Sequence, residues 1–166
     1  MTSQRKPLIA AEQAPMAFFS PTYRRAVEAS QHHAAHPGAT WSEDDWRSRL
    51  SPMQYAVLRR GATEPAGSSP LLRERRAGLF VCAGCARPLF SSAAKFDSDS
   101  GWPSFSAALD HAVDEESDHS GDETRIEVHC HRCGSHLGHV FNDGPGPGGL
   151  RYCINGTALT FLPERR

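Results

Sequence analysis

Two Cys-x-x-Cys pairs constrain this chain more than any other feature. Cys82 and Cys85 form the first pair, Cys130 and Cys133 form the second, and residues 86–129 separate them. Two such pairs can supply the four thiolates of a closed tetrahedral zinc site, which leaves no open position for chemistry. The spacing therefore predicts one structural zinc ion that joins two distant parts of the chain.

Each pair has an alternative interpretation as a redox motif of the thioredoxin kind. That motif requires a βαβ context, and neither pair is followed by a good helical pattern. Gly134, after the second pair, suits a turn around a metal because glycine tolerates positive φ, whereas Ala86, after the first, suits it less well. We favour zinc, which leaves Cys153 as the one thiol free for chemistry.

The length and net charge of the chain limit the classes of protein to which it can belong. The 166 residues allow one domain plus a tail, and we expect a flexible extension over residues 1–37 and the domain over 38–166. Lys and Arg do not outnumber Asp and Glu, and the net charge is −1, so a nucleic-acid partner is not expected. No apolar run reaches the roughly 18 residues of a membrane span, and the N-terminus lacks a secretory pattern. A free thiol beside a metal site fits a reducing compartment, so we expect a cytoplasmic protein. The extension holds His32, His33 and His36, which we interpret as solvated histidines and not as ligands.

Helix signals precede the cysteines. Thr40 or Ser42 is a candidate N-cap for one short helix. A second helix is predicted to begin at Ser51-Pro52 with a capping box and to end at Gly61.

From Gly78 onward the pattern is one of short strands separated by turns. Strands are expected at residues 79–81, 88–90, 124–130, 140–141, 150–155 and 159–161. Asn155-Gly156 predicts a hairpin turn between the last two strands, and the acidic stretch 114–123 is expected to be a solvated loop. This pattern predicts a mainly β, antiparallel domain covered by short N-terminal helices.

Three polar segments are candidates for a site. If the segment around Cys153 is a strand, Arg151, Cys153 and Asn155 share one face as cation, nucleophile and amide. The plainer alternative is a buried, inert cysteine beside a surface ion pair. His136 and His139 lie three residues apart with Asp143 nearby; they could bind a metal or donate protons.

The third segment, residues 95–105, faintly resembles a calcium loop. Asp97, Asp99 and Gly101 fit such a loop, but Ala108 stands where its closing glutamate is required, so we reject calcium. Trp102 and Phe105 are either core aromatics or the wall of an apolar pocket.

In combination these motifs resemble those of the type B methionine sulfoxide reductases. The resemblance runs from about Trp46 to Phe161 and rests on the two cysteine pairs, GWPSF at 101–105, HLGHVFNDGP at 136–145 and RYCIN at 151–155. It implies two antiparallel β-sheets in a small sandwich or barrel-like core, with the zinc clamp opposite the active site. It also implies that Cys153 is the catalytic cysteine and that Trp102, with Phe141 as a helper, packs on the substrate's methyl group. The polar positions of the site are then His136, His139, Asp143, Arg151 and Asn155.

The resemblance further implies reduction of the R epimer of methionine sulfoxide, in proteins or free. Cys153, kept as thiolate by Arg151 and the histidines, attacks the sulfoxide sulfur while an acid protonates the oxygen. His139 is our first candidate for that acid and His136 the second. Methionine departs and Cys153 remains as a sulfenic acid.

One position departs from the family pattern. Many members carry a resolving cysteine just before GWPSF, and this chain has Ser100 there. We therefore expect direct reduction of Cys153 by an external thiol such as thioredoxin, glutathione or a glutaredoxin. The rival hypothesis, a zinc-clamped binding module without catalysis, does not require a lone thiol flanked by Arg151 and Asn155.

Overall fold

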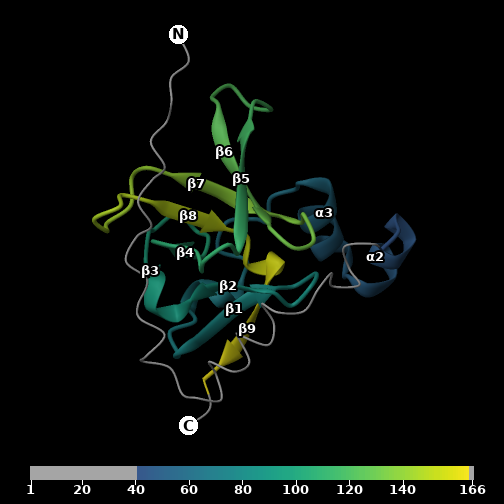
Figure 1. Ribbon diagram of the computed structural model, residues 1–166, viewed down its shortest axis with the longest axis horizontal. Helices are drawn as coiled ribbons and strands as arrows, with labels where there is room; N and C mark the ends of the chain where they lie inside the picture. Colours follow the sequence, from purple (N-terminus) through teal and green to yellow (C-terminus); the bar gives the residue numbers. More distant parts are fainter. Residues whose placement is uncertain (1–40, 165–166) are drawn as a thin grey trace.

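The computed structural model describes residues 41–164, which form two antiparallel β-sheets with helices beside them (Figure 1). The smaller sheet has the order β2–β1–β9, made of Pro88–Ser91, Gly78–Cys82 and Leu159–Pro163. The larger sheet has the order β3–β4–β8–β7–β6–β5, made of Lys95–Phe96, Ser104–Phe105, Arg151–Ile154, His136–Phe141, Arg125–Cys130 and Val113–Asp118. The expectation of a mainly β fold with two antiparallel sheets is confirmed. The extension predicted over residues 1–37 lies outside the described residues.

The two predicted helices form where their caps indicate. Helix α2 (Glu43–Arg49) begins after Ser42, and helix α3 (Pro52–Arg60) begins after Ser51; both serines complete a capping box. Gly61 ends α3 with a φ of 70°, a left-handed conformation that glycine adopts without strain. In the part of the chain that the structure describes, no helix is long and apolar enough to cross a membrane.

Aromatic side chains fill the space between the sheets. The rings of Phe90 (β2) and Phe105 (β4) stack with centroids 4.4 Å apart, and Phe80 (β1) meets Phe105 edge-on at 5.0 Å. All three are fully buried. Since Phe105 belongs to the larger sheet and the other two to the smaller, this cluster fixes one sheet against the other.

Two sequence predictions were wrong. Asn155-Gly156 does not make a hairpin: residues Gly156–Ala158 form a short 3-10 helix, η5, that carries the chain from β8 in the larger sheet to β9 in the smaller one. The acidic stretch 114–123 is not all loop, because residues 113–118 form strand β5 at the edge of the larger sheet. The strand tolerates its acidic residues because four of its six side chains are exposed to solvent. Figure 1 shows the β5–β6 hairpin reaching beyond the rest of the sheet.

Short 3-10 turns connect these elements and set up the site. They are η3 (Pro70–Arg73), η4 (Ser92–Ala94) and η5, each preceded by a residue in extended conformation. The segment between α3 and η3 returns across the end of β8, so that residues near position 64 contact the chain that follows Cys153.

Candidate active site and metal site

A row of polar residues crosses one face of the larger sheet. Cys153 on β8 lies opposite Ser104 on one side and opposite His139 on the other, and the row continues through Glu127 on β6 to Glu116 on β5. Side chains directly opposite one another on neighbouring strands point to the same face. The antiparallel register therefore brings the nucleophile and histidine predicted from the sequence side by side.

The neighbouring rows point the other way, into the core. Phe105, Tyr152 and Val140 are opposite one another on β4, β8 and β7, and all three are buried. Gly138 is needed on β7 because a Cβ there would lie 2.0 Å from the carbonyl oxygen of Cys153. The sheet thus has one apolar face for the core and one polar face for the site.

A cavity of about 290 Å³ opens on this polar face. Its size is close to the roughly 300 Å³ at the lower end of ligand pockets, which suits one amino-acid side chain. Among the residues predicted from the sequence, the cavity lining includes Cys153, His139, Arg151, Asn155, Trp102 and Phe141; it also includes Thr63, Ser100, Arg125 and Gly138. His136 and Asp143 do not line it.

Cys153 is half-buried at this cavity. Burial raises the pKa of its thiol above the ordinary value, while Ser100 and the charge of Arg151 act in the opposite direction. Arg151 therefore weakens the effect of burial but does not overcome it. The part expected of Arg151, to favour the thiolate of Cys153, stays a prediction; its charge acts in that direction and against burial.

Asp143 acts on the cavity through Arg151. Its carboxylate accepts two hydrogen bonds from the guanidinium, at 2.8 and 3.1 Å, and Arg151 Cζ lies 4.5 Å from the centre of the Phe141 ring. A bidentate pair of this kind fixes the plane of the guanidinium. Asp143 thus holds the cation beside Cys153 without touching the cavity.

His139 has a carboxylate partner that sequence reasoning missed. Its Nε2 lies 2.8 Å from Oδ2 of Asp118, which ends β5. Hydrogen bonds from Ser120, followed by that from His139, hold the pKa of Asp118 well below its usual value, so the carboxylate is ionised and accepts. Nε2 of His139 therefore carries the proton. Asp118 was missed because its strand was interpreted as a solvated loop.

His136 faces a different group. It is 6% exposed, and its Nδ1 lies 2.5 Å from Oε1 of Glu127. Burial lowers the pKa of His136, although Glu127 acts to raise it. The two histidines of the motif therefore differ: His139 lines the cavity opposite Cys153, and His136 lies behind it as a neutral, buried ring.

Glu64 is a second residue that sequence reasoning missed. It is 3% exposed, and its carboxylate accepts hydrogen bonds from the backbone N–H groups of Gly156 (2.6 Å) and Thr157 (2.9 Å). Its own N–H donates to the Asn155 side chain, and its carbonyl oxygen accepts from the Trp102 indole at 3.0 Å. One residue thereby ties the aromatic wall of the cavity to the chain after Cys153. A lone glutamate in a Gly- and Pro-rich stretch carries no pattern that would have identified it.

Both the oxygen and the nitrogen of the Asn155 side-chain amide make hydrogen bonds to the backbone. Its oxygen accepts from Glu64 N and its nitrogen donates to Leu137 O at 3.0 Å. It lines the cavity as the residue that anchors the end of β8 to β7, and not as a free amide.

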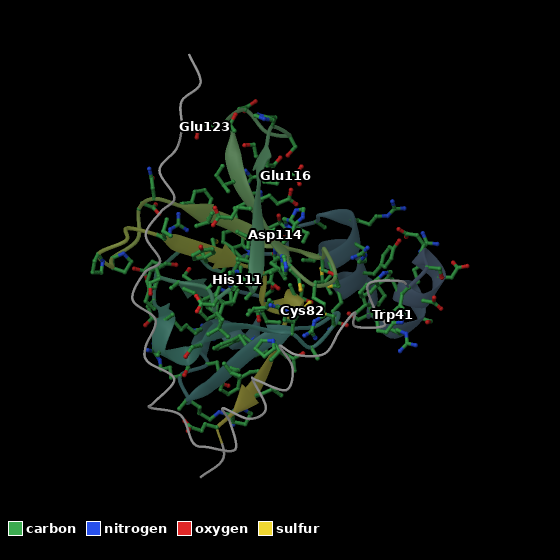
Figure 2. The ribbon with its side chains drawn as sticks, viewed as in Figure 1. Trp41, Cys82, His111, Asp114, Glu116 and Glu123 are labelled. Carbon is green, nitrogen blue, oxygen red and sulfur yellow. The ribbon has the colours of Figure 1, made fainter. Side chains whose placement is uncertain are left out.

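The four paired cysteines form one buried cluster, as their spacing predicted. Their sulfur atoms all lie within 4.8 Å of one another, with Cys82–Cys133 at 3.7 Å and Cys85–Cys130 at 3.6 Å. Zinc–sulfur bonds of about 2.3 Å place sulfurs roughly 3.8 Å apart in a tetrahedron, so the donor set and its spacing fit zinc. Figure 2 labels Cys82, where the yellow sulfur atoms gather near α3.

The pKa values of the four thiols also favour a bound metal ion. Hydrogen bonds among the neighbouring sulfur groups raise the pKa values of Cys82 and Cys130 and lower those of Cys85 and Cys133. Four buried thiols therefore cannot all ionise by themselves, and a bound dication is what allows four thiolates together.

Both cysteine pairs make the same turn. Ala86 N donates to Cys82 O and Gly134 N donates to Cys130 O, and both residues have positive φ, 63° and 71°. The turn expected at Gly134 is confirmed, and Ala86 adopts it as well, although its Cβ makes that conformation less favourable.

Helix α3 covers the second turn. Arg59 donates to Cys133 O at 3.0 Å, and its guanidinium lies 4.4 Å from the centre of the buried Trp46 ring. The N-terminal helices are therefore anchored on the metal site. The cluster joins the β1–β2 turn of one sheet to the β6–β7 turn of the other, and none of its cysteines lines the cavity.

Comparison with known proteins shows the family to which this chain belongs. The SelR domain matches residues 50–163. A protein of Bradyrhizobium diazoefficiens is 57% identical over 124 residues, which cover 74% of this chain and 89% of that protein. A protein of Leptospira interrogans is 49% identical over 124 residues, covering 74% and 95%, and one of Methanosarcina mazei is 51% identical over 124 residues, covering 74% and 89%. All three are named "Peptide methionine sulfoxide reductase MsrB".

Proposed function

The chain belongs to the SelR-domain family and is a peptide methionine sulfoxide reductase, and from that premise we propose how its own residues reduce the R epimer of methionine sulfoxide. The observation that carries the proposal is the position of Cys153. It is the one cysteine of the described residues outside the metal cluster, and it lines the cavity opposite His139.

The substrate's side chain enters the cavity with its S-methyl group against Trp102, helped by Phe141. Trp102 is held by its hydrogen bond to Glu64 O, and Phe141 lies under the Arg151 guanidinium. Rigid aromatic walls of this kind orient a small apolar group without ordering flexible side chains.

Cys153 then attacks the sulfoxide sulfur. The thiol gives up its proton, the sulfoxide oxygen is protonated, and the oxygen is transferred to Cys153 as methionine leaves. The sulfur of the substrate is reduced and that of Cys153 is oxidised to a sulfenic acid. Burial raises the pKa of this thiol, and Arg151 is the nearby cation that favours the thiolate as the proton leaves.

His139 supplies the proton. It lines the cavity, it is opposite Cys153, and its ring is held by a hydrogen bond to the Asp118 carboxylate. His136 is the second candidate; its burial and its lowered pKa disfavour it as a source of protons.

An external thiol regenerates the enzyme. It attacks the Cys153 sulfenic acid, releases water and leaves a mixed disulfide, which a second thiol resolves. Ser100 occupies the position of the missing resolving cysteine, and the remaining thiols belong to the metal cluster. Thioredoxin, glutathione or a glutaredoxin fits this role in a reducing cytoplasm.

The four-cysteine site would hold one structural Zn²⁺ through Cys82, Cys85, Cys130 and Cys133. A closed shell of four thiolates supplies folding free energy and no catalytic position. Its residues join the larger sheet, which carries the cavity, to the smaller one.

The proposal is tested with both epimers of a methionine sulfoxide peptide and a dithiol reductant. Wild-type protein should reduce the R epimer and leave the S epimer, and Cys153→Ser should lose the activity while keeping its fold. Loss of an essential nucleophile costs far more than about a hundredfold. Equal turnover of both epimers, or a Cys153→Ser variant within about tenfold of wild type, would contradict the proposal.

A further inference from the structure

A second group of potential metal ligands lies beside the site, on the same face of the larger sheet. Glu127 and His129 of β6 and His136 of β7 each place one ligand atom within 4.8 Å of the other two. We propose that Glu127, His129 and His136 form a binding site for a transition-metal dication of the zinc type, separate from the four-cysteine site. This inference does not depend on the roles proposed for Cys153 and His139, and it uses His136, the second candidate acid, as a ligand.

The strand register creates the cluster. Glu127 and His129 are two residues apart on β6, and His129 lies opposite His136 on β7. The β6–β7 register shifts between Val128 and His129, and such an irregularity redirects the side chains around it. As a result Glu127 Oε1 lies 2.5 Å from Nδ1 of His136 and 2.9 Å from Nε2 of His129.

Two ring nitrogens of the cluster lack hydrogen bonds. Nε2 of His129 and Nε2 of His136 are buried and, among the residues that the structure describes, make no hydrogen bond. His129 Nε2 lies 2.9 Å from Glu127 but is not aligned with it as a hydrogen bond requires. A buried polar atom without a partner is costly, and an imidazole nitrogen in that state is a candidate metal ligand. His129 places Nε2 at Glu127, whereas the nitrogen that His136 places there is Nδ1.

The local charge favours a cation. Glu116 on β5 lies directly opposite Glu127, so two carboxylates share one position across the strands (Glu116 is labelled in Figure 2). Like charges in that arrangement destabilise a sheet unless something compensates them.

The donor set selects the kind of metal. Two imidazoles and one carboxylate suit Zn²⁺ and neighbouring transition metals, whereas Ca²⁺ and Mg²⁺ prefer oxygen ligands alone. Metal–ligand bonds of about 2.0–2.1 Å place tetrahedral ligands roughly 3.3 Å apart, and the three ligand atoms lie within 4.8 Å of one another, with Glu127 at 2.5 Å from His136 and 2.9 Å from His129. A small outward shift of the carboxylate then admits the ion, and three protein ligands leave its fourth position to water. His129, whose side chain is 26% exposed, gives access from solvent.

The test is the metal stoichiometry of purified full-length protein. The extension contributes His32, His33 and His36, so all proteins carry glutamine at these three positions and no affinity tag. After equilibrium dialysis against micromolar Zn²⁺, elemental analysis should give two zinc ions per chain. His129→Gln should give one, while His131→Gln should give two, because His131 is an exposed histidine paired with Asp114 outside the cluster.

Circular dichroism should show the same fold for all three proteins, since His129 and His131 are not core residues. One zinc ion per chain in the parent protein would overturn the proposal. So would a second ion that His129→Gln retains with unchanged affinity. Loss of the second ion in His131→Gln as well would show that the binding is not specific to the cluster.

Discussion

Ser100 Oγ lies 4.0 Å from Cys153 Sγ, and both atoms belong to residues that line the cavity. A disulfide joins two sulfurs at about 2.05 Å, so a thiol at position 100 would need only a local movement to reach Cys153. The serine is instead held in a loop by bonds with Ser98 and the Trp102 backbone. Position 100 is therefore close enough to Cys153 to test whether a thiol placed there can bond to it.

Replacement of Ser100 by cysteine should change the regeneration step. After one turnover with methionine R-sulfoxide, Ser100→Cys should contain a disulfide between Cys153 and the introduced thiol, detected by peptide mass spectrometry, and a sulfenic-acid probe should label it less than wild type. Ser98→Cys is the matched control, because its side chain bonds to Ser100 and Ser104 but not to Cys153. If Ser100→Cys forms no bridge and still accumulates the sulfenic acid, the loop does not serve as a resolving position.

Glu64→Gln should weaken substrate binding. An amide cannot accept from both N–H groups of Gly156 and Thr157 as the carboxylate does, and a buried donor left unpaired costs about 1–3 kcal/mol. The backbone carbonyl of Glu64 accepts from Trp102, so a backbone that shifts when the side chain loses its anchor also moves Trp102. We therefore expect kcat/KM to fall about tenfold, equivalent to ~1.4 kcal/mol, mainly through KM.

Asp97→Asn is the control for Glu64→Gln. Asp97 pairs with Arg75 at the surface, where a salt bridge contributes little, and its removal should leave kcat/KM and stability unchanged. An unchanged KM in Glu64→Gln, with only the melting temperature lowered, would limit Glu64 to a structural role.

Arg151→Met should make Cys153 harder to ionise. Burial already raises the pKa of this thiol, and the positive charge of Arg151 opposes that effect, so removing the charge moves the pKa further up. The thiolate fraction at a given pH falls, and alkylation of Cys153 by iodoacetamide at about pH 8 should slow severalfold as its pH profile moves to higher pH. Arg125→Met, which also removes a cavity cation, should not move the profile. A profile that moves to lower pH in Arg151→Met would contradict this account.

Local chemistry was enough to predict the helices and the four-cysteine cluster. Ser51-Pro52 and Gly61 act within a few residues of themselves, and two Cys-x-x-Cys pairs have few uses other than one tetrahedral site. The pairing of Arg151, Cys153 and His139 at one cavity followed from the strand interpretation and the family resemblance.

Residues whose partners are distant in sequence were not predictable in this way. The strand Val113–Asp118 is held by its pairing with β6, which outweighs the low strand preference of its acidic residues, and Asp118 meets His139 only because of that pairing. The Glu64 carboxylate contacts residues 92 and 93 positions further along the chain. The Asn155-Gly156 hairpin failed because the core requires the chain to change sheets there.

Separate substitutions at Ala86 and Gly134, which follow the two Cys-x-x-Cys pairs, should have opposite effects on stability. Ala86 and Gly134 share a left-handed conformation that costs a residue with a Cβ about 1 kcal/mol. Ala86→Gly should therefore stabilise the zinc-bound protein by about 1 kcal/mol, and Gly134→Ala, where a Cβ meets no neighbouring atom, should destabilise it by a similar amount. Urea unfolding measures both. Destabilisation by Ala86→Gly would show that the Ala86 side chain contributes packing that outweighs its strain.

A single-turnover experiment with thiol counting tests the central claim most directly. Reduced, zinc-loaded protein is mixed with excess methionine R-sulfoxide without a reductant, and methionine, free thiols and zinc are measured together. The account predicts one methionine per chain, the loss of one thiol of the five, a sulfenic acid on Cys153 and full retention of zinc. Loss of two thiols, with a disulfide between Cys153 and one of the four cluster cysteines and release of zinc, would show that the separation of one catalytic cysteine from four structural ones is wrong.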